Sequence, residues 1–270
     1  MSGFSFRLKA DPGERLNITA LTPGRLRGLA NAEISALVVG GSKRHLTVGD
    51  VFDVAGDAGD TVNIHSGTAT LDFAGAEMDS GTLNIDGDVG AYAGRKMRGG
   101  KLEVRGNAGN YLASGMSGGM IHITGSAGDN LGGVLSGDRF GMIGGTVVVG
   151  GSIGARAGDK MRRGTVIVKG KTGEGAGTRM IGGTIWAEGG FGPAPGYMMR
   201  RGTLIGSTVE RLLPTFVDCG RHDLLIVRIL SRHLKATLGD LAPKPMPLFV
   251  QRIAGDMATI GKGEILLPAL

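Results

Sequence analysis

Basic side chains recur beside regularly spaced methionines in the middle of the chain, and together they could bind an anion. Eight of them form a set that we call the basic ladder: Lys96, Arg98, Lys160, Arg162, Arg163, Arg179, Arg200 and Arg201. Several lysines and arginines on one flank attract anions, and the net charge of +6 has the same sign. The ladder therefore predicts contact with an extended polyanion or an acidic partner surface, the alternative being a solvated edge that only discourages strand pairing.

The other reactive side chains form no catalytic or metal-binding set in the sequence. The five histidines show no metal-ligand spacing, and Cys219, the single cysteine, is expected to be a buried small hydrophobe. Polysaccharide-cleaving enzymes gather their carboxylates, whereas the carboxylates here occupy different positions of the repeat: Asp86, Glu103, Asp129, Asp159, Glu174 and Glu188. The sequence predicts neither a catalytic residue nor a metal site on this chain.

Several binding classes are also disfavoured. No aromatic residues interleave with the basic ones, as single-strand binders require, so a nucleic-acid partner is not expected. The glycine-rich units lack the ending of a phosphate loop, and their corners lack the aspartates of calcium-binding repeats. Because no long apolar run and no secretion signal occur, the sequence predicts a soluble, cytoplasmic protein without a membrane partner.

The element that must position the basic ladder is a repeat. The methionines that open its copies are separated by 19, 19, 26, 19, 19 and 19 residues: Met78, Met97, Met116, Met142, Met161, Met180 and Met199. In the six complete copies, glycines follow three, nine and twelve residues after the methionine, as in Gly81, Gly87 and Gly90. A fixed period of this length indicates stacked structural units.

Each unit contains one short strand with two inward positions. Side chains alternate along a strand, so stacking the units aligns two apolar columns. One column is Leu83, Leu102, Ile121, Val147, Val166, Ile185 and Leu204, and the other is Ile85, Val104, Ile123, Val149, Val168 and Ala187. Coils about 4.8 Å apart would bury both columns and spread the basic ladder over roughly 24 Å. We therefore predict an all-β fold, a right-handed parallel β-helix (solenoid) with coils of about 19 residues.

The ends of this solenoid need covers, because open ends would expose strand edges. We predict an N-terminal cap with degenerate first coils in residues 1–77, regular coils in 78–207, and a C-terminal helix and tail in 208–270. The helix is expected over residues 223–238, ending at Gly239. The outward strand positions are polar in Asn84, Glu103 and His122 and turn apolar in the next four copies: Val148, Ile167, Trp186 and Ile205. This helix or another subunit should therefore cover those four.

The single irregular interval adds seven residues in the region from Leu131 to Phe140. Insertions in a solenoid become loops that protrude from one face. A contact site and a neutral insertion are both compatible with this segment.

Two of the units carry a resemblance to a known family. Residues 97–109, Met-Arg-Gly-Gly-Lys-Leu-Glu-Val-Arg-Gly-Asn-Ala-Gly, and residues 161–173, Met-Arg-Arg-Gly-Thr-Val-Ile-Val-Lys-Gly-Lys-Thr-Gly, resemble the glycine-repeat β-helix of glutamate synthase C-terminal domains and of the formylmethanofuran dehydrogenase C-subunit. The resemblance covers about residues 45–207, and the tail at 255–257 and 261–264 is also similar to the C-subunit family. A chain of this length looks like a free-standing C-subunit.

The resemblance implies a role in one-carbon metabolism. In methylotrophic bacteria it implies a formyltransferase/hydrolase complex that moves formyl groups from tetrahydromethanopterin to a methanofuran-like carrier and releases formate. The implied partners are an amidohydrolase-like hydrolase subunit, a formyltransferase subunit and a further subunit, which hold the chemistry. This chain would then be a scaffold that binds no cofactor, and its basic ladder is a candidate guide for the glutamate tail of the carrier.

Three alternatives stay open at this point. The resemblance also fits the C-subunit of an archaeal molybdenum or tungsten formylmethanofuran dehydrogenase, although a basic chain rich in Ala, Gly and Arg favours the bacterial complex. The basic ladder would dock an acidic neighbouring subunit in a pure interaction protein. An independent β-helix carbohydrate-active enzyme is the remaining class, and it predicts activity from the purified chain.

Overall fold

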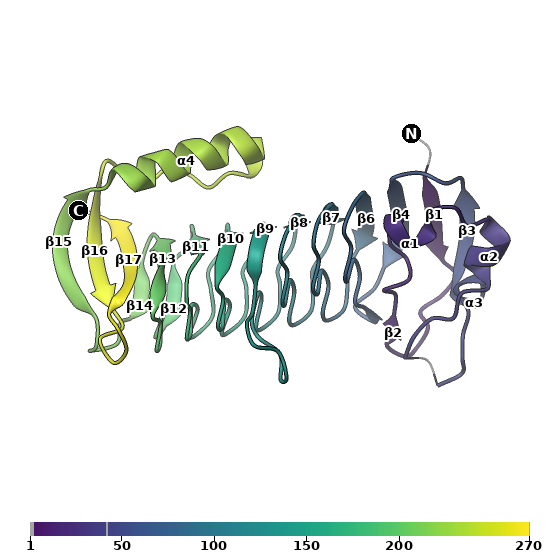
Figure 1. Ribbon diagram of the computed structural model, residues 1–270, viewed down its shortest axis with the longest axis horizontal. Helices are drawn as coiled ribbons and strands as arrows, with labels where there is room; N and C mark the ends of the chain where they lie inside the picture. Colours follow the sequence, from purple (N-terminus) through teal and green to yellow (C-terminus); the bar gives the residue numbers. More distant parts are fainter. Residues whose placement is uncertain (1–2, 42, 270) are drawn as a thin grey trace.

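The computed structural model describes residues 3–41 and 43–269, and most of its regular structure is β-strand (Figure 1). The N-terminal part contains β1 (Phe4–Leu8), β2 (Leu16–Asn17), α1 (Pro23–Leu26), α2 (Asn31–Ser35), α3 (Val48–Val51), β3 (Phe52–Gly56), β4 (Thr61–Gly67) and β5 (Leu71–Asp72). The middle contains β6 (Thr82–Gly87), β7 (Lys101–Val104), β8 (Met120–Ile123), β9 (Ile143–Val149), β10 (Arg163–Val168), β11 (Thr184–Ala187), β12 (Phe191–Pro193) and β13 (Arg201–Gly206). The C-terminal part contains β14 (Val209–Arg211), β15 (Val217–Asp223), α4 (Leu225–Leu238), a 3₁₀ turn (Gly239–Leu241), β16 (Phe249–Gly255) and β17 (Lys262–Pro268).

Thirteen of these strands form one sheet, which runs along the length of the molecule. Its order is β15-β16-β17-β13-β11-β10-β9-β8-β7-β6-β4-β1-β3, and pairing is parallel from β17 through to β1. Each strand pairs with the strand one repeat later, so Leu102 lies beside Ile121 and Val104 beside Ile123. The all-β class and the parallel pairing at the repeat period are confirmed. We call each turn of the chain between successive strands a coil.

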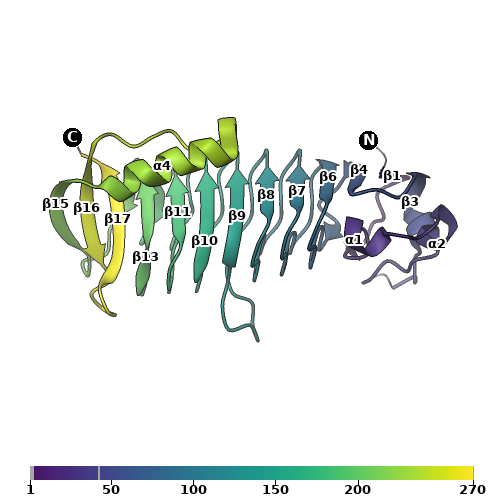
Figure 2. The same ribbon diagram turned by 45° about the horizontal axis from the view of Figure 1, so that its top comes forward.

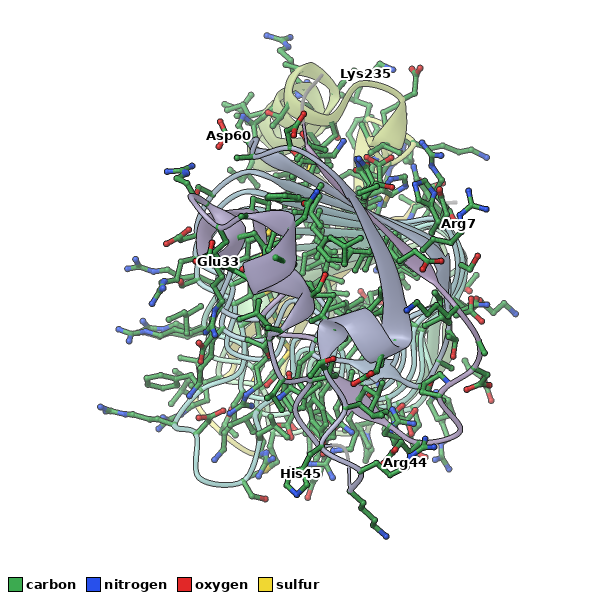
Figure 3. All side chains as sticks on the ribbon, turned by 90° about the vertical axis from the view of Figure 1, so that its right-hand side faces the viewer. Arg7, Glu33, Arg44, His45, Asp60 and Lys235 are labelled. Carbon is green, nitrogen blue, oxygen red and sulfur yellow. The ribbon has the colours of Figure 1, made fainter. Side chains whose placement is uncertain are left out.

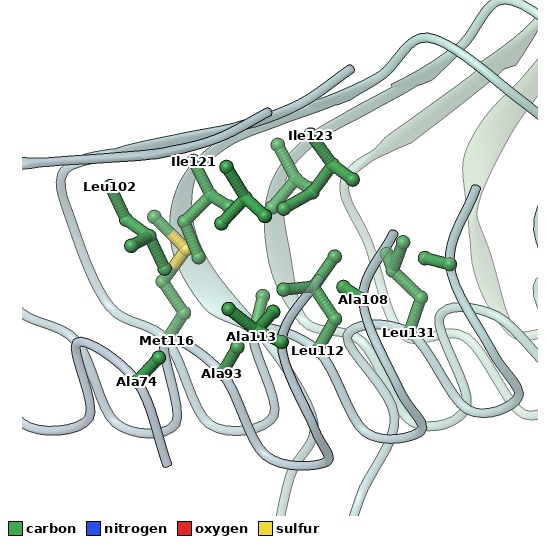
Figure 4. Packing of buried hydrophobic residues seen from close by; sticks show 14 of the residues in the cluster. Ala74, Ala93, Leu102, Ala108, Leu112, Ala113, Met116, Ile121, Ile123 and Leu131 are labelled. Carbon is green, nitrogen blue, oxygen red and sulfur yellow. The ribbon is translucent and has the colours of Figure 1, made fainter. Parts of the chain in front are cut away.

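Both predicted apolar columns lie inside the coils. Every residue of the two columns is buried, as are all seven repeating methionines. The two columns lie side by side on the inner face of the large sheet, and corner residues such as Leu112 and Ala113 lie opposite them across the narrow interior (Figure 4). Each buried Leu, Ile or Val side chain contributes about 1.5–3 kcal/mol, so these columns stabilise the stack together with the buried methionines and corner residues.

The repeating methionines pack against the repeating glycines. A Cβ placed on Gly119, whose φ is 85°, would lie 2.8 Å from backbone atoms of Gly99 and Gly100 and 2.9 Å from Cε of Met97 in the preceding coil. The left-handed φ and the close backbone therefore favour glycine there, and the methionine of the coil below fills the space beside it. The same methionine contact repeats between Met116 and Gly145, where the distance would be 2.6 Å.

A second line of contacts joins the coils on the side away from the large sheet. Isolated parallel bridges connect Val89, Ala108, Ala127, Ile153, Thr172 and Phe191 in succession. Gly173 follows this line, and a Cβ there would lie 2.7, 2.8 and 2.9 Å from three backbone atoms of Gly154 and Ala155. The backbones of neighbouring coils therefore approach too closely for any side chain at this position.

Helix α4 covers the apolar half of the outer sheet face. Val227, Leu234 and Leu238 of the helix form one buried cluster with strand residues that include Trp186 and Ile205. Figure 2 shows α4 lying across the strands from β13 to β9, whereas β6, β7 and β8 are left uncovered. The helix is thus the one of the two expected coverings of the outer stripe that the structure contains. The helix begins at Leu225, two residues later than predicted, because Asp223 pairs with Phe249 in the sheet.

The two ends of the sheet carry antiparallel strands. At the N-terminal end β3 pairs antiparallel with β1. Short helices lie at this end of the coils, as the end-on view in Figure 3 shows, and α2 and α3 contact β3. At the C-terminal end β16 pairs antiparallel with both β15 and β17. These antiparallel strands end the parallel stack, which fits the expected covering of both ends.

One sequence expectation is wrong. Cys219 is exposed, because it lies in the edge strand β15, whose outer side has no neighbouring strand in the sheet. Its Sγ atom contacts only the carbonyl oxygen of Val217, at 3.6 Å, among the hydrogen bonds of the described residues. It does not fill the core.

Candidate functional site

The basic ladder lies at one corner of successive coils, directly before and after the buried methionines. Lys160 and Arg179 precede their methionines and take φ values of 53° and 51°. A non-glycine residue pays roughly 1–2 kcal/mol for this left-handed conformation. Lys160, Arg179 and Arg200 line one cavity of about 570 Å³ together with Arg139, Phe140, Ile181, Met198, Thr259 and Ile260. The structure therefore brings part of the ladder together around a single hollow.

Arg179 is bound to a carboxylate that the sequence reasoning did not associate with it. Asp159 is 3% exposed, and its oxygens accept hydrogen bonds from Nε of Arg179 at 2.8 Å and from Nη2 of Arg156 at 3.0 Å. The hydrogen bond to Asp159 raises the pKa of Arg179. Asp159 thus fixes the orientation of two guanidinium groups and neutralises part of their charge.

The inserted segment protrudes from this corner, as predicted (Figure 1). Its Asp138 pairs with Nη1 of Arg95 at 3.2 Å and with Nζ of Lys96 at 3.4 Å, so the loop is tied back to an earlier coil. Lys96 is therefore partly neutralised. On the other side of the loop, Phe140 has the guanidinium groups of Arg139 and Arg162 each 5.0 Å from its ring centre, within cation–π range.

The remaining ladder residues lie apart from this hollow. Arg98 lines a separate cavity of about 530 Å³ with Arg25, Arg27, Glu77 and Asp79. Arg163 and Arg201 begin strands β10 and β13, and both side chains are exposed. Within residues 3–41 and 43–269, no carboxylate lies within ion-pair distance of Arg98, Lys160, Arg162, Arg163, Arg200 or Arg201. The ladder is thus not one continuous row of equivalent cations.

An aromatic stack at the same corner was missed in the sequence. Phe73, Tyr92 and Tyr111 stack with ring centres 4.7 and 5.6 Å apart. Their spacing of 19 residues repeats that of the methionines and was the available signal. Tyr111 also lines a cavity of about 390 Å³ with the inserted loop and Lys160. The aromatic stack therefore ends beside a cavity that contains Lys160, a residue that also lines the cavity of about 570 Å³.

Titratable side chains also gather on the uncovered strands of the outer face. Nζ of Lys101 lies 2.8 Å from Glu103, and Nδ1 of His122 lies 3.8 Å from the same carboxylate. Burial lowers the pKa of His122 below its ordinary value of 6.5, and the attraction of Glu103 only partly offsets this. The folded protein therefore prefers the neutral imidazole.

A pH dependence of stability follows from His122. Since its pKa is lower in the folded than in the unfolded chain, its contribution is complete above about pH 6.5 and is lost as the pH falls below that value. The free energy of unfolding of the His122→Gln variant should therefore decline less between pH 7.5 and pH 5.5 than that of the parent. Denaturant titrations at each pH measure this free energy. An equal decline in the two proteins would show that the pKa of His122 is the same in the folded and the unfolded chain.

In the part of the chain that the structure describes, no three His, Cys, Asp or Glu side chains lie close enough together to hold a metal ion. None of the helices in residues 3–41 and 43–269 combines the length and apolar character that a membrane crossing requires.

Comparison with known proteins gives two matches of high identity. No protein-family model matches the chain. The C-subunit of the formyltransferase/hydrolase complex Fhc from Methylorubrum extorquens is 44% identical over 86 residues, an alignment that spans 32% of either chain. A chain in the crystal structure of the complex FhcABCD from Methylorubrum extorquens, determined with methylofuran, is 42% identical. That match covers 98% of this chain and 100% of the other, with a TM-score of 0.93. The chain belongs to the C-subunit family of formyltransferase/hydrolase complexes.

Proposed function

We propose that this chain is a non-catalytic scaffold subunit of a formyltransferase/hydrolase complex. The complex would move formyl groups from tetrahydromethanopterin to a methanofuran-like carrier and release formate. The observation that carries the proposal is the likeness over 98% of the chain to a chain of a complex that contains methylofuran. The partners would be an amidohydrolase-like hydrolase subunit, a formyltransferase subunit and a further subunit, all in the cytoplasm, and this chain would bind no cofactor itself.

A scaffold role agrees with the architecture. We propose that the coils form a right-handed parallel β-helix, with residues 1–77 as cap and first coils, 78–207 as regular coils and 208–270 as the helix and tail packed on them. The in-register parallel pairing and the buried cluster beneath α4 support this division. Such a stack is stiff, because its interior is closely packed and every coil pairs with both neighbours.

The exposed ladder residues are candidate guides for the glutamate tail of the carrier. Arg163 and Arg201 are the best placed, because each is exposed at the start of a strand of the large sheet and has no ion-pair partner among the described residues. Arg98, Arg162 and Arg200 extend the same function along the corner. Lys96 and Arg179 contribute less, since Asp138 and Asp159 already neutralise them.

The proposal is tested first by affinity purification of the tagged chain from its native host, followed by mass spectrometry. We expect an amidohydrolase-like subunit together with a formyltransferase. A molybdopterin subunit with iron–sulfur partners would move the assignment to the archaeal type of dehydrogenase. Recovery of the chain alone would contradict the scaffold role, and activity of the isolated chain on polysaccharides would favour the carbohydrate-active class.

Tail guidance is tested by replacing Arg162, Arg163, Arg200 and Arg201 by glutamine in the assembled complex. We expect an intact complex that uses the carrier less well, because four cations are lost from the proposed path. The control replaces four basic residues away from the ladder, Arg7, Arg105, Lys171 and Arg211, by glutamine. A dissociated complex would instead indicate that the ladder docks an acidic subunit.

A further inference from the structure

The cavity of about 570 Å³ at the basic corner is built from three parts of the chain that are distant in sequence. The inserted loop supplies Arg139 and Phe140, and the turn between β16 and β17 supplies Thr259 and Ile260. The coil corners between them supply the other lining residues: Lys160, Arg179, Ile181, Met198 and Arg200. The single irregularity of the repeat thus meets the C-terminal turn at one hollow.

Hydrogen bonds hold the C-terminal wall of this cavity in place. Asp256 is 1% exposed and accepts from the backbone N–H of Met198 at 2.9 Å and from that of Ala258 at 2.9 Å. The hydroxyl of Thr259 donates to the carbonyl oxygen of Met199 at 2.6 Å. On the opposite wall, Phe140 lies against the guanidinium groups of Arg139 and Arg162. The cavity is therefore formed in advance of any ligand, which lowers the entropic cost of binding.

Its floor displays apolar side chains to solvent. Met198 is 38% exposed and Ile260 is 47% exposed, and Phe140 and Ile181 line the same hollow. Met198 holds the position just before the repeating methionine, where four other coils carry a charged residue: Glu77, Lys96, Lys160 and Arg179. The hollow thus receives an apolar side chain where other coils present a charge. Exposed apolar groups that line a concavity are typical of contact surfaces.

Its rim is cationic and has no carboxylate. None of the nine lining residues is acidic, and within the described residues Arg139, Lys160 and Arg200 have no ion-pair partner. Arg179, the fourth cation, is bound to Asp159. A complementary ligand must therefore carry negative charge at its edges and an apolar group at its centre. A carrier tail made only of glutamates would pair with the cations of the rim but would leave the apolar floor in contact with water.

We propose that this cavity docks an acidic segment of a partner subunit, with one large apolar side chain of that segment seated on Phe140, Ile181, Met198 and Ile260. The inference rests on the proposed function, because it requires that the chain is part of a complex. Aspartates or glutamates that flank the apolar side chain pair with Arg139 and Lys160. Charge on the rim orients the segment, and burial of the apolar side chain supplies most of the affinity.

Photo-crosslinking in the assembled complex identifies the occupant. The full chain carries p-benzoylphenylalanine in place of Phe140, and in a control preparation in place of Val38, which is 62% exposed at the N-terminal end. We expect the probe at position 140 to crosslink to one partner subunit, at an apolar residue with acidic neighbours. A crosslink only to the carrier, or none above the control, would overturn the proposal.

A charge-reversed variant measures the contribution of the rim. Arg139→Glu combined with Lys160→Glu should reduce the yield of the crosslinked subunit in affinity purification at least tenfold, since both side chains would repel its carboxylates. The control is Lys171→Glu combined with Arg211→Glu, which makes the same change in net charge elsewhere. An unchanged yield with the cavity variant overturns docking here while the scaffold role stands. If the parent chain retains no subunit, both proposals fail, so the two failures are distinguishable.

Discussion

Replacement of Trp186 by alanine is expected to release helix α4 from the sheet. Trp186 is 1% exposed and lies in the cluster that joins the outer strand residues to Val227, Leu234 and Leu238 of the helix. Loss of a buried tryptophan costs about 3–5 kcal/mol, because the cavity that it leaves cannot collapse fully. Since coils interact mainly with their neighbours, the loss should be local to α4 and the strands beneath it.

Hydrogen exchange of the α4 amides is the direct measurement. We expect exchange at least about a hundredfold faster in the Trp186→Ala variant, with the amides of β6 to β8 little changed. The matched control is Ile226→Ala, on the exposed side of the same helix, where the side chain is 61% accessible. It should change the stability by less than about 0.5 kcal/mol. Equal protection of α4 in both variants would show that the helix is held by other contacts.

Substitution of Gly173 by valine should prevent two coils from stacking. A Cβ at this position would lie within 2.9 Å of three backbone atoms of Gly154 and Ala155, and backbone cannot rotate away as a side chain can. The N–H of Gly173 also donates to the carbonyl oxygen of Ile153 at 2.9 Å, a bond between coils that the displacement would break. The combined loss should exceed about 3 kcal/mol, the upper part of the range for overpacking.

Denaturant unfolding and the yield of soluble protein measure this effect. The control is Glu174→Val, which places the same side chain one residue later, where the native side chain is exposed. That variant should fold with nearly unchanged stability. If Gly173→Val proved as stable as Glu174→Val, the close approach of the two backbones would not be obligatory.

Most of the coil architecture could be predicted from the sequence, because the repeat specifies it many times over. Each unit repeats the same strand, the same two inward positions and the same corner, so the prediction for one coil is supported by the other coils. The covering helix was also predictable, since Val148, Ile167, Trp186 and Ile205 are apolar at outward positions. Cys219 was misplaced because it lies outside the repeat, where a lone cysteine carries no register information.

The site was predictable only in part. Spacing placed the basic ladder at one corner, but it could not show which cations are neutralised by partners distant in sequence. Asp138 reaches back to Arg95 from a loop with no repeat partner, and Asp159 binds Arg179 from the preceding coil. Nothing in the sequence indicated that the C-terminal turn with Ile260 lies beside the inserted loop. These contacts depend on how the chain returns in space, which periodicity does not encode.

The seven-residue insertion leaves the strands on either side of it in register, with Ile123 beside Val149. Loop length at a corner is therefore independent of the rise between strands, which stays near 4.8 Å per coil. The length of the stack therefore changes only in whole coils. Gain or loss of one 19-residue unit would change the distance between the two ends by about 4.8 Å, whereas a change in a corner loop would alter the surface at that coil and leave the length unchanged. The distance between binding surfaces and the partners that they bind can thus vary independently.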